Sequence, residues 1–263
     1  MALSCAMLAG ILCEMSPKVF AAGQMYMVKD GSPGAEIIVA EKPTRTAKLA
    51  ASELQRFIKL ISGATLPIAN APSGKYPVTL YVGDSPEADR LNLGKETMEY
   101  GAFRIASGKD WMALLGDDVD YVPPEPWPRN PGDKKEVARV MEDWDAKTGA
   151  KWGNPLMSTD RLYSPLLDLW VTDGRGSINA VYHLLKTLGV RWYYPDETGL
   201  IVPAMKDILM PDLNLVSRPD FPMRDMLVYY NEFLHARPGV EVMCDRIKWQ
   251  LWLGLNSDVN VLG

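Results

Sequence analysis

The sequence predicts an α/β domain in which helices pack on a small mixed sheet. Short β-branched runs alternate along the chain with segments whose apolar residues recur at helical spacing. Two further runs are joined by a tight "SGKD" turn at 107–110, which is typical of an antiparallel hairpin. The chain has 263 residues, of which 47% are hydrophobic, so it can bury a substantial core and form one or two domains.

The first half of the domain contains two strands and two helices. The run "AEIIVAE" (35–41) predicts a strand, and "TRTAKLAASELQRFIKLISG" after it predicts an amphipathic helix that ends at Gly63. The run "YPVTLYVGD" (76–84) predicts a buried strand that ends at a glycine turn. Ser85 and Pro86 then provide the cap and the first position of a short helix.

The second half continues the alternation. Residues 100–117 predict two strands of a hairpin, and 176–188 predict a helix with one apolar face, followed by the strand "VRWYY". Residues 208–224 predict a connector with one short strand. A new strand is expected at "MRDMLVYYN" (223–231) and a helix at about 240–252.

Residues 118–173 interrupt this pattern and are predicted to form an insertion. Its first part, "VPPEPWPRNPGD", has too many prolines for a sheet or helix interior, and "KKEVARVMEDWDAKTG" predicts a polar helix. Trp127, Trp144 and Trp152 lie in this insertion. Aromatic faces can stack on sugar rings, so Trp127 and Trp152 are candidates for carbohydrate contact. The alternative is that the tryptophans anchor a long loop.

The N-terminal residues 1–22 predict a signal peptide. An apolar run at 2–13 is followed by the small residues Ala21 and Ala22, and the run is too short to span a bilayer. We therefore expect an exported protein, periplasmic or extracellular, with no membrane span, whereas a buried N-terminal helix is the alternative. Removal of the segment would leave Cys244 as the single thiol, so no internal disulfide is expected.

Composition and motifs argue against several classes of partner. The formal net charge is −5 and no Lys/Arg-rich tract occurs, which argues against nucleic acid. Gly174 and Gly176 open a helix, but they lack both the GK[ST] of a phosphate loop and a third spaced glycine, so we expect no nucleotide cofactor and assign them to close packing. His183 and His235 have no second ligand at metal spacing, so no metal site is predicted.

The segments "ELQRFIKLISGATLPI" and "LLKTLGVRWYYPDE" carry a more specific signal than any single motif. With them, the chain over 35–263, apart from the insertion, resembles the N-terminal α/β domain of alpha-glucuronidases. It is also similar to the domain that precedes the barrel of beta-hexosaminidases. The resemblance implies that residues 23–218 form a non-catalytic accessory domain of a glycoside hydrolase, packed beside a TIM barrel.

The segment "RPDFPMRDMLVYYN" looks like the join into the first barrel strand of these families. The resemblance implies that 219–263 begin a TIM barrel and that Arg224 contacts the substrate sugar. Asp225 departs from the pattern, because hexosaminidases commonly have glycine there. A barrel needs about 200 residues or more, so the catalytic carboxylates are expected beyond this chain, which would be the front part of a longer hydrolase.

Other side chains are weaker candidates for function. Asp196 and Glu197 are adjacent, so in an extended segment they point to opposite faces and do not form a catalytic pair. Alternation places Trp192 opposite Arg191 and Tyr193, which favours domain packing at the "VRWYY" strand. Two other hypotheses stay open. The tryptophans of the insertion would suit a stand-alone carbohydrate-binding module, and the "VRWYY" strand would suit a structural domain that mediates protein association.

Overall fold

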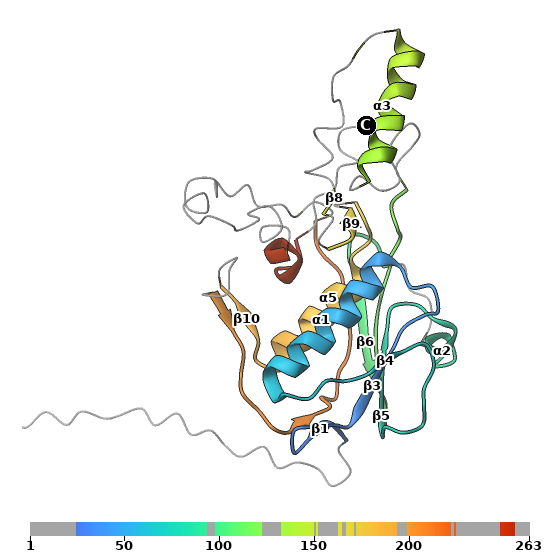
Figure 1. Ribbon diagram of the computed structural model, residues 1–263. Helices are drawn as coiled ribbons and strands as arrows, with labels where there is room; N and C mark the ends of the chain where they lie inside the picture. The colour runs from blue at the N-terminus through green and yellow to red at the C-terminus, as the bar shows by residue number, and fades with distance from the viewer. Residues whose placement is uncertain are drawn as a thin grey trace, which may run out of the picture.

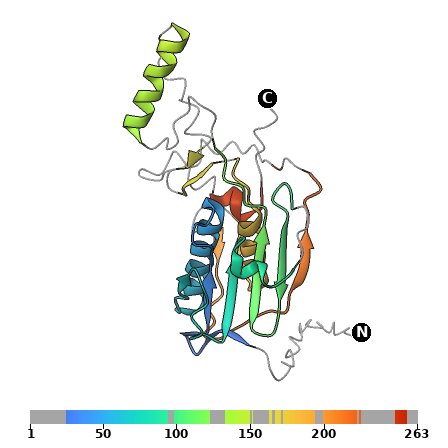
Figure 2. The same ribbon diagram turned by 90° about the vertical axis from the view of Figure 1, so that its right-hand side faces the viewer.

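A six-stranded mixed sheet forms the centre of the computed structural model (Figures 1 and 2). The structure describes residues 25–93, 98–122, 133–149, 151, 163–164, 167–170, 172–193, 199–221, 224 and 248–255. The strand order is β13-β6-β7-β5-β3-β4; the last four run parallel, and β6 and β13 are antiparallel to their neighbours. The bounds in chain order are β3 (Ala35–Ile38), β4 (Ile68–Ala69), β5 (Val78–Val82), β6 (Phe103–Ser107), β7 (Trp111–Gly116) and β13 (Asn214–Ser217). This mixed α/β architecture confirms the predicted fold class.

Two helices, α1 (Arg45–Ser62) and α5 (Gly176–Thr187), cover one face of the sheet and lie side by side (Figures 1 and 2). Helix α1 begins where the Thr44 side chain accepts a hydrogen bond from Ala47 N. It ends at Gly63, whose φ of 82° suits a residue without a Cβ. Both limits agree with the sequence prediction.

Both faces of the central strands are buried, because side chains alternate between two apolar clusters. In β3, Ile37 belongs to the large cluster under α1 and α5, whereas Ile38 belongs to a smaller cluster on the opposite face. The smaller cluster is covered by α2 (Pro86–Asp89), through Ala88, and by the turn after it. The cap predicted for α2 is present, since the Ser85 side chain accepts from Ala88 N.

Short strands complete the described chain. Strand β1 (Tyr26–Lys29) lies between β2 (Ser32–Pro33) and β12 (Ile208–Leu209), and the two hairpins are β8 (Tyr163–Ser164) with β9 (Leu169–Trp170), and β10 (Arg191–Trp192) with β11 (Leu200–Ile201). Helix α3 (Lys134–Thr148) stands apart from the sheet, at the end where β8 and β9 lie (Figures 1 and 2). No helix in the described part of the chain is both long and apolar enough to cross a bilayer.

Two sequence predictions were wrong in detail. The connector at 208–224 contains two strands rather than one, because β12 pairs with β1 and β13 pairs with β6 at the edge of the main sheet. Helix α5 is buried around most of its circumference, including Ser177, Asn179 and Ala180, and not along one stripe alone. The reason is that α5 contacts the sheet, α1 and, through Tyr182, residue Trp252 of the C-terminal segment.

Several predicted segments lie outside the described residues. They include the signal peptide at 1–22, the proline-rich part of the insertion, and most of the expected barrel start, with its strand at 223–231. Of the helix expected at about 240–252, residues 248–252 are described and are helical. The division into 1–22, 23–218 and 219–263 stays a prediction.

Candidate functional site

The glycines around the start of α5, Gly174 and Gly176, serve close packing, as predicted. A Cβ built on Gly176 would lie 2.4 Å from Gly116 Cα, so the start of α5 touches the end of β7 backbone to backbone. A Cβ on Gly174 would lie 2.4 Å from the carbonyl oxygen of Asp117. Neither position tolerates a side chain without a backbone shift.

A buried ion pair holds the two ends of segment 118–173 against the start of α1. The Asp173 side chain is fully buried and accepts from Arg45 through two atoms, at 3.0 Å from Nε and 2.6 Å from one terminal nitrogen. It also accepts from the backbone N–H groups of Tyr121, at 2.7 Å, and Trp170, at 2.8 Å. The paired carboxylate raises the pKa of Arg45. Asp173 therefore fixes where this segment leaves and rejoins the domain.

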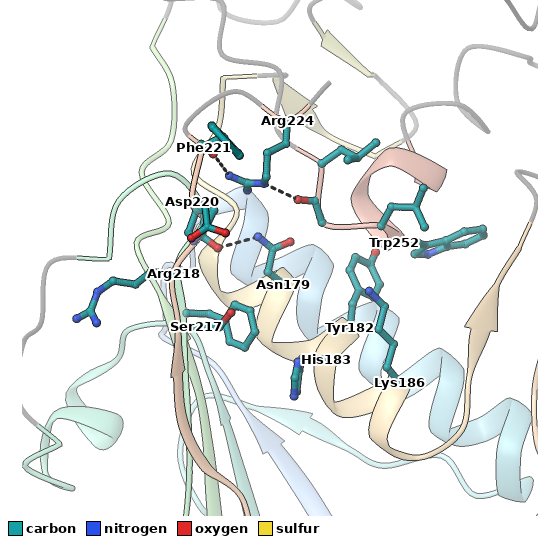
Figure 3. A pocket seen from close by; sticks show the side chains of 16 residues that line it. Asn179, Tyr182, His183, Lys186, Ser217, Arg218, Asp220, Phe221, Arg224 and Trp252 are labelled. Atoms are coloured by element: carbon teal, nitrogen blue, oxygen red, sulfur yellow. Dashed lines mark hydrogen bonds between the residues drawn. The ribbon is translucent and has the colours of Figure 1, made fainter. Parts of the chain in front are cut away.

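A pocket of about 400 Å³ lies beside α5, between the residues that follow β13 and the turn at 252–255 (Figure 3). We call it the α5 pocket. Asn179, Tyr182, His183 and Lys186 line it from the helix, because positions three, four and seven apart share one face. The other lining residues are Gly101 in the turn before β6, Phe103 at the start of β6, residues 217–221, Arg224 and residues 252–255.

Arg224 lies in the wall of the α5 pocket and joins three backbone segments (Figure 3). Its guanidinium donates to the carbonyl oxygens of Phe221 at 2.7 Å, Tyr100 at 2.9 Å and Gly254 at 3.2 Å. No carboxylate pairs with it among the described residues, and burial lowers its pKa. The predicted site residue thus has an evident structural role, and its contact with a sugar stays a prediction.

Asn179 supports the same corner of the pocket. Its Nδ2 donates to the carbonyl oxygen of Gly101 at 2.8 Å, which fixes the orientation of the amide. Its Oδ1 is buried and has no hydrogen-bond partner in the structure. Gly101 has a φ of 78°, and a Cβ there would lie 2.8 Å from Nδ2, so this position requires glycine.

Lys186 and Arg218 are the other cationic residues that line the α5 pocket. Figure 3 shows Lys186 extending along the same side of α5 as Tyr182, whereas Arg218 points away from the other labelled side chains. Burial lowers the pKa of Lys186, and the charge of Arg191 lowers it further. The pKa of His183 is lowered, first by burial and then by Lys186, so the imidazole is neutral at physiological pH.

An aromatic cluster closes the inner side of the pocket. Trp192 packs against Phe57 and Tyr182, each at a ring-centroid distance of 5.5 Å, and stacks on Trp252 at 5.8 Å. Trp192 is 4% exposed while Tyr193 is 69% exposed, which confirms the predicted alternation at this strand. The outer face of β10 is therefore available for packing, and its inner face belongs to the core.

The structure does not describe several of the other residues singled out in the sequence. Trp127, Trp152, Asp196, Glu197, His235 and Cys244 lie outside the described residues. In the part of the chain that the structure describes, no three His, Cys, Asp or Glu side chains come together in a group that could hold a metal ion. Among the residues that line the α5 pocket, Asp220 is the single carboxylate.

Sequence reasoning missed Asn179, Lys186 and Asp220. The spacing of Asn179 and Lys186 on α5 was a usable signal, because two polar residues seven apart share a face of a helix whose remaining positions are mostly apolar. Asp220 gave no such signal, since only the tertiary structure brings the residues after β13 to this helix.

The fold and the site together define a mixed α/β domain with a cation-bearing pocket beside helix α5. No family model matches the chain, and no curated protein matches it significantly. Solved structures do match. One is BtGH115A, described as a novel family GH115 4-O-methyl-alpha-glucuronidase with specificity for decorated arabinogalactans.

The alignment with this glucuronidase has a TM-score of 0.51 at 13% sequence identity, and covers 88% of this chain and 25% of the glucuronidase. At that identity the similarity shows a shared fold and nothing of the chemistry. The chain spans about a quarter of the length of the enzyme it matches.

Proposed function

We propose that this chain forms a non-catalytic α/β domain of a carbohydrate-active hydrolase and precedes a TIM barrel that carries the catalytic carboxylates. The observation that carries the proposal is the match of 88% of the chain to one quarter of a GH115 glucuronidase. Because nearly all of this chain matches only a quarter of the longer enzyme, an accessory role within such an enzyme fits the match. The neighbour's described specificity suggests arabinogalactan decorated with 4-O-methylglucuronate as the substrate of the whole hydrolase.

The chemistry of the α5 pocket supports a role outside catalysis. Glycoside hydrolysis normally uses two carboxyl groups, about 5 to 9.5 Å apart, that face one bond. Asp220 has no second carboxylate beside it among the residues that line the pocket. The catalytic pair is therefore proposed to come from barrel strands.

Arg224 is proposed to support the join between this domain and the barrel. Three of the five guanidinium N–H groups donate to carbonyl oxygens from three segments of the chain. The charge is thereby held at a fixed place, with two N–H groups left for a sugar hydroxyl. Arg224 could therefore support the join and contact a sugar at the same time, because the two roles use different N–H groups.

An activity comparison tests the proposal. The purified 263-residue chain and the longer product of its reading frame would be incubated with decorated arabinogalactan, and release of 4-O-methylglucuronate would be measured. We expect no release by the 263-residue chain and turnover by the longer product. Turnover by the short chain would refute the accessory role, and a longer product without a barrel or glycosidase activity would refute the link to saccharide hydrolysis.

A further inference from the structure

We propose that the α5 pocket binds a small hydroxycarboxylate, a molecule with one carboxylate group and neighbouring hydroxyl groups. This inference goes beyond the proposed function, because it concerns a ligand site formed by described residues of this chain and does not depend on glycoside hydrolysis. It rests on the charges, the polar groups and the size of the pocket.

The charges favour an anion. Lys186 and Arg224 both line the pocket, and neither has a carboxylate partner among the described residues. This arrangement is unusual in a chain with a formal net charge of −5, where acids outnumber bases. Burial lowers the pKa of both groups, so a bound carboxylate would offset the cost of holding their charges away from water.

Arg224 and Lys186 differ in how they can act on a ligand. Three carbonyl oxygens hold the guanidinium of Arg224 in place. Lys186 has a flexible stem and extends along the pocket side of α5 (Figure 3). A ligand in the pocket would therefore meet one charge at a fixed place and a second charge that can adjust to it.

Other groups in the pocket suit hydroxyls and a carbon skeleton. Asp220 provides carboxylate oxygens that accept hydrogen bonds from hydroxyl groups. The buried Oδ1 of Asn179 lacks a donor, and a hydroxyl that entered beside Gly254 would satisfy it. Phe221 and Trp252 add aromatic surface for C–H groups.

The size of the pocket limits the ligand to a compact molecule. Its volume of about 400 Å³ is near the lower end of the range for ligand sites, roughly 300 to 1,000 Å³. A six-carbon hydroxy acid is of suitable size, whereas an oligosaccharide would extend beyond it. We therefore choose D-gluconate as the probe.

A titration with three probes tests the proposal on the 263-residue chain. Isothermal calorimetry would measure binding of D-gluconate, of D-glucose, which has hydroxyls without the charge, and of acetate, which has the charge without hydroxyls. We expect gluconate to bind more tightly than either. Lys186→Gln should weaken gluconate binding about tenfold, because it removes a hydrogen bond to a charged group.

Lys109→Gln is the matched control, because Lys109 is an exposed lysine in the β6–β7 turn and does not line the pocket. Thermal unfolding of each variant would show that the fold is intact. Gluconate binding no tighter than that of glucose or acetate would overturn the proposal, as would a Lys186→Gln variant that binds gluconate like wild type. Neither result depends on hydrolysis by the longer product, so the two proposals can fail separately.

Discussion

At the scale of single residues, the most constrained position is the contact between Gly176 and Gly116. A Cβ built on either glycine would lie only 2.2 to 2.4 Å from backbone atoms of the other glycine. Backbone cannot move aside as the end of a flexible side chain can. The sequence pattern "DGRGS" therefore reflects packing of a helix start on a strand end, and its glycines have no need of a phosphate ligand.

Gly176→Ala should lower the free energy of unfolding by about 3 kcal/mol or more, because the new methyl group overlaps the β7 backbone. Gly74→Ala is the comparison: Gly74 has a φ of 70° and no atom within 4 Å of a built Cβ. That change should cost only about 1 kcal/mol, the penalty for a left-handed conformation. Urea unfolding measures both, and an equal or smaller loss for Gly176→Ala would contradict the packing argument.

At the scale of elements, the junction between β7 and α5 contains an unusual carboxyl group. Asp118 Oδ1 accepts from Ser177 N at 2.9 Å, at the start of α5, while its Oδ2 is buried with no hydrogen-bond partner. Burial raises the pKa of Asp118 from 3.8 to about 7, helped by the charges of Asp84 and Asp117 and opposed by the hydrogen bond from Ser177. The junction is therefore destabilised when this carboxyl group ionises.

The sign of the pH dependence follows from the raised pKa of Asp118. Between pH 3.8 and about 7 the unfolded chain binds fewer protons at this group than the native chain. Its contribution to stability therefore falls as pH rises through that window and is level above it.

Asp118→Asn should remove this fall, because an amide keeps the acceptor for Ser177 N and does not ionise. The variant should gain at least about 1 kcal/mol over wild type at about pH 8 and nothing near pH 4. Denaturant unfolding across this pH range measures the difference. Asp110→Asn, at an exposed position in the β6–β7 turn whose charge is not among the causes of the Asp118 shift, is the control. An Asp118→Asn variant that follows the wild-type pH profile would contradict the assignment.

At the scale of the whole molecule, Glu53 connects three parts of the chain that are distant in sequence. From α1 its Oε2 accepts from Tyr182 OH on α5 at 3.3 Å and from Trp252 Nε1 at 3.1 Å. Its Oε1 lies 3.5 Å from Arg56 and 3.7 Å from Lys248. The carboxylate thus holds the C-terminal segment, and with it one wall of the α5 pocket, against the helical layer.

Glu53→Leu should lower the free energy of unfolding by roughly 2 to 4 kcal/mol, because two buried donors lose their acceptor. Glu53→Gln keeps an acceptor at that place and loses only the charge, so its cost should stay below about 1 kcal/mol. Tryptophan fluorescence during urea unfolding would report both. A leucine variant as stable as the glutamine variant would show that Glu53 does not connect these parts.

Local patterns were sufficient for most of the individual elements. The helical spacing of apolar residues in "AASELQRFIKLIS" and the terminal Gly63 gave α1 correctly, and the two runs around "SGKD" gave the β6–β7 hairpin. These features depend on neighbours within a few residues of one another, whose periodicity and turn chemistry are written directly in the sequence.

The sequence by itself determined the α/β class, the helix limits at Thr44 and Gly63, the packing role of the glycines and the placement of Trp192 on the face opposite Tyr193. Only the tertiary structure decided that β13 joins the sheet beside β6, and that Lys186, Asp220 and Arg224 meet in one pocket. The physical reason is the separation of the interacting residues along the chain. Local periodicity determines which face of an element is apolar, whereas packing between segments far apart in the chain determines which element covers that face.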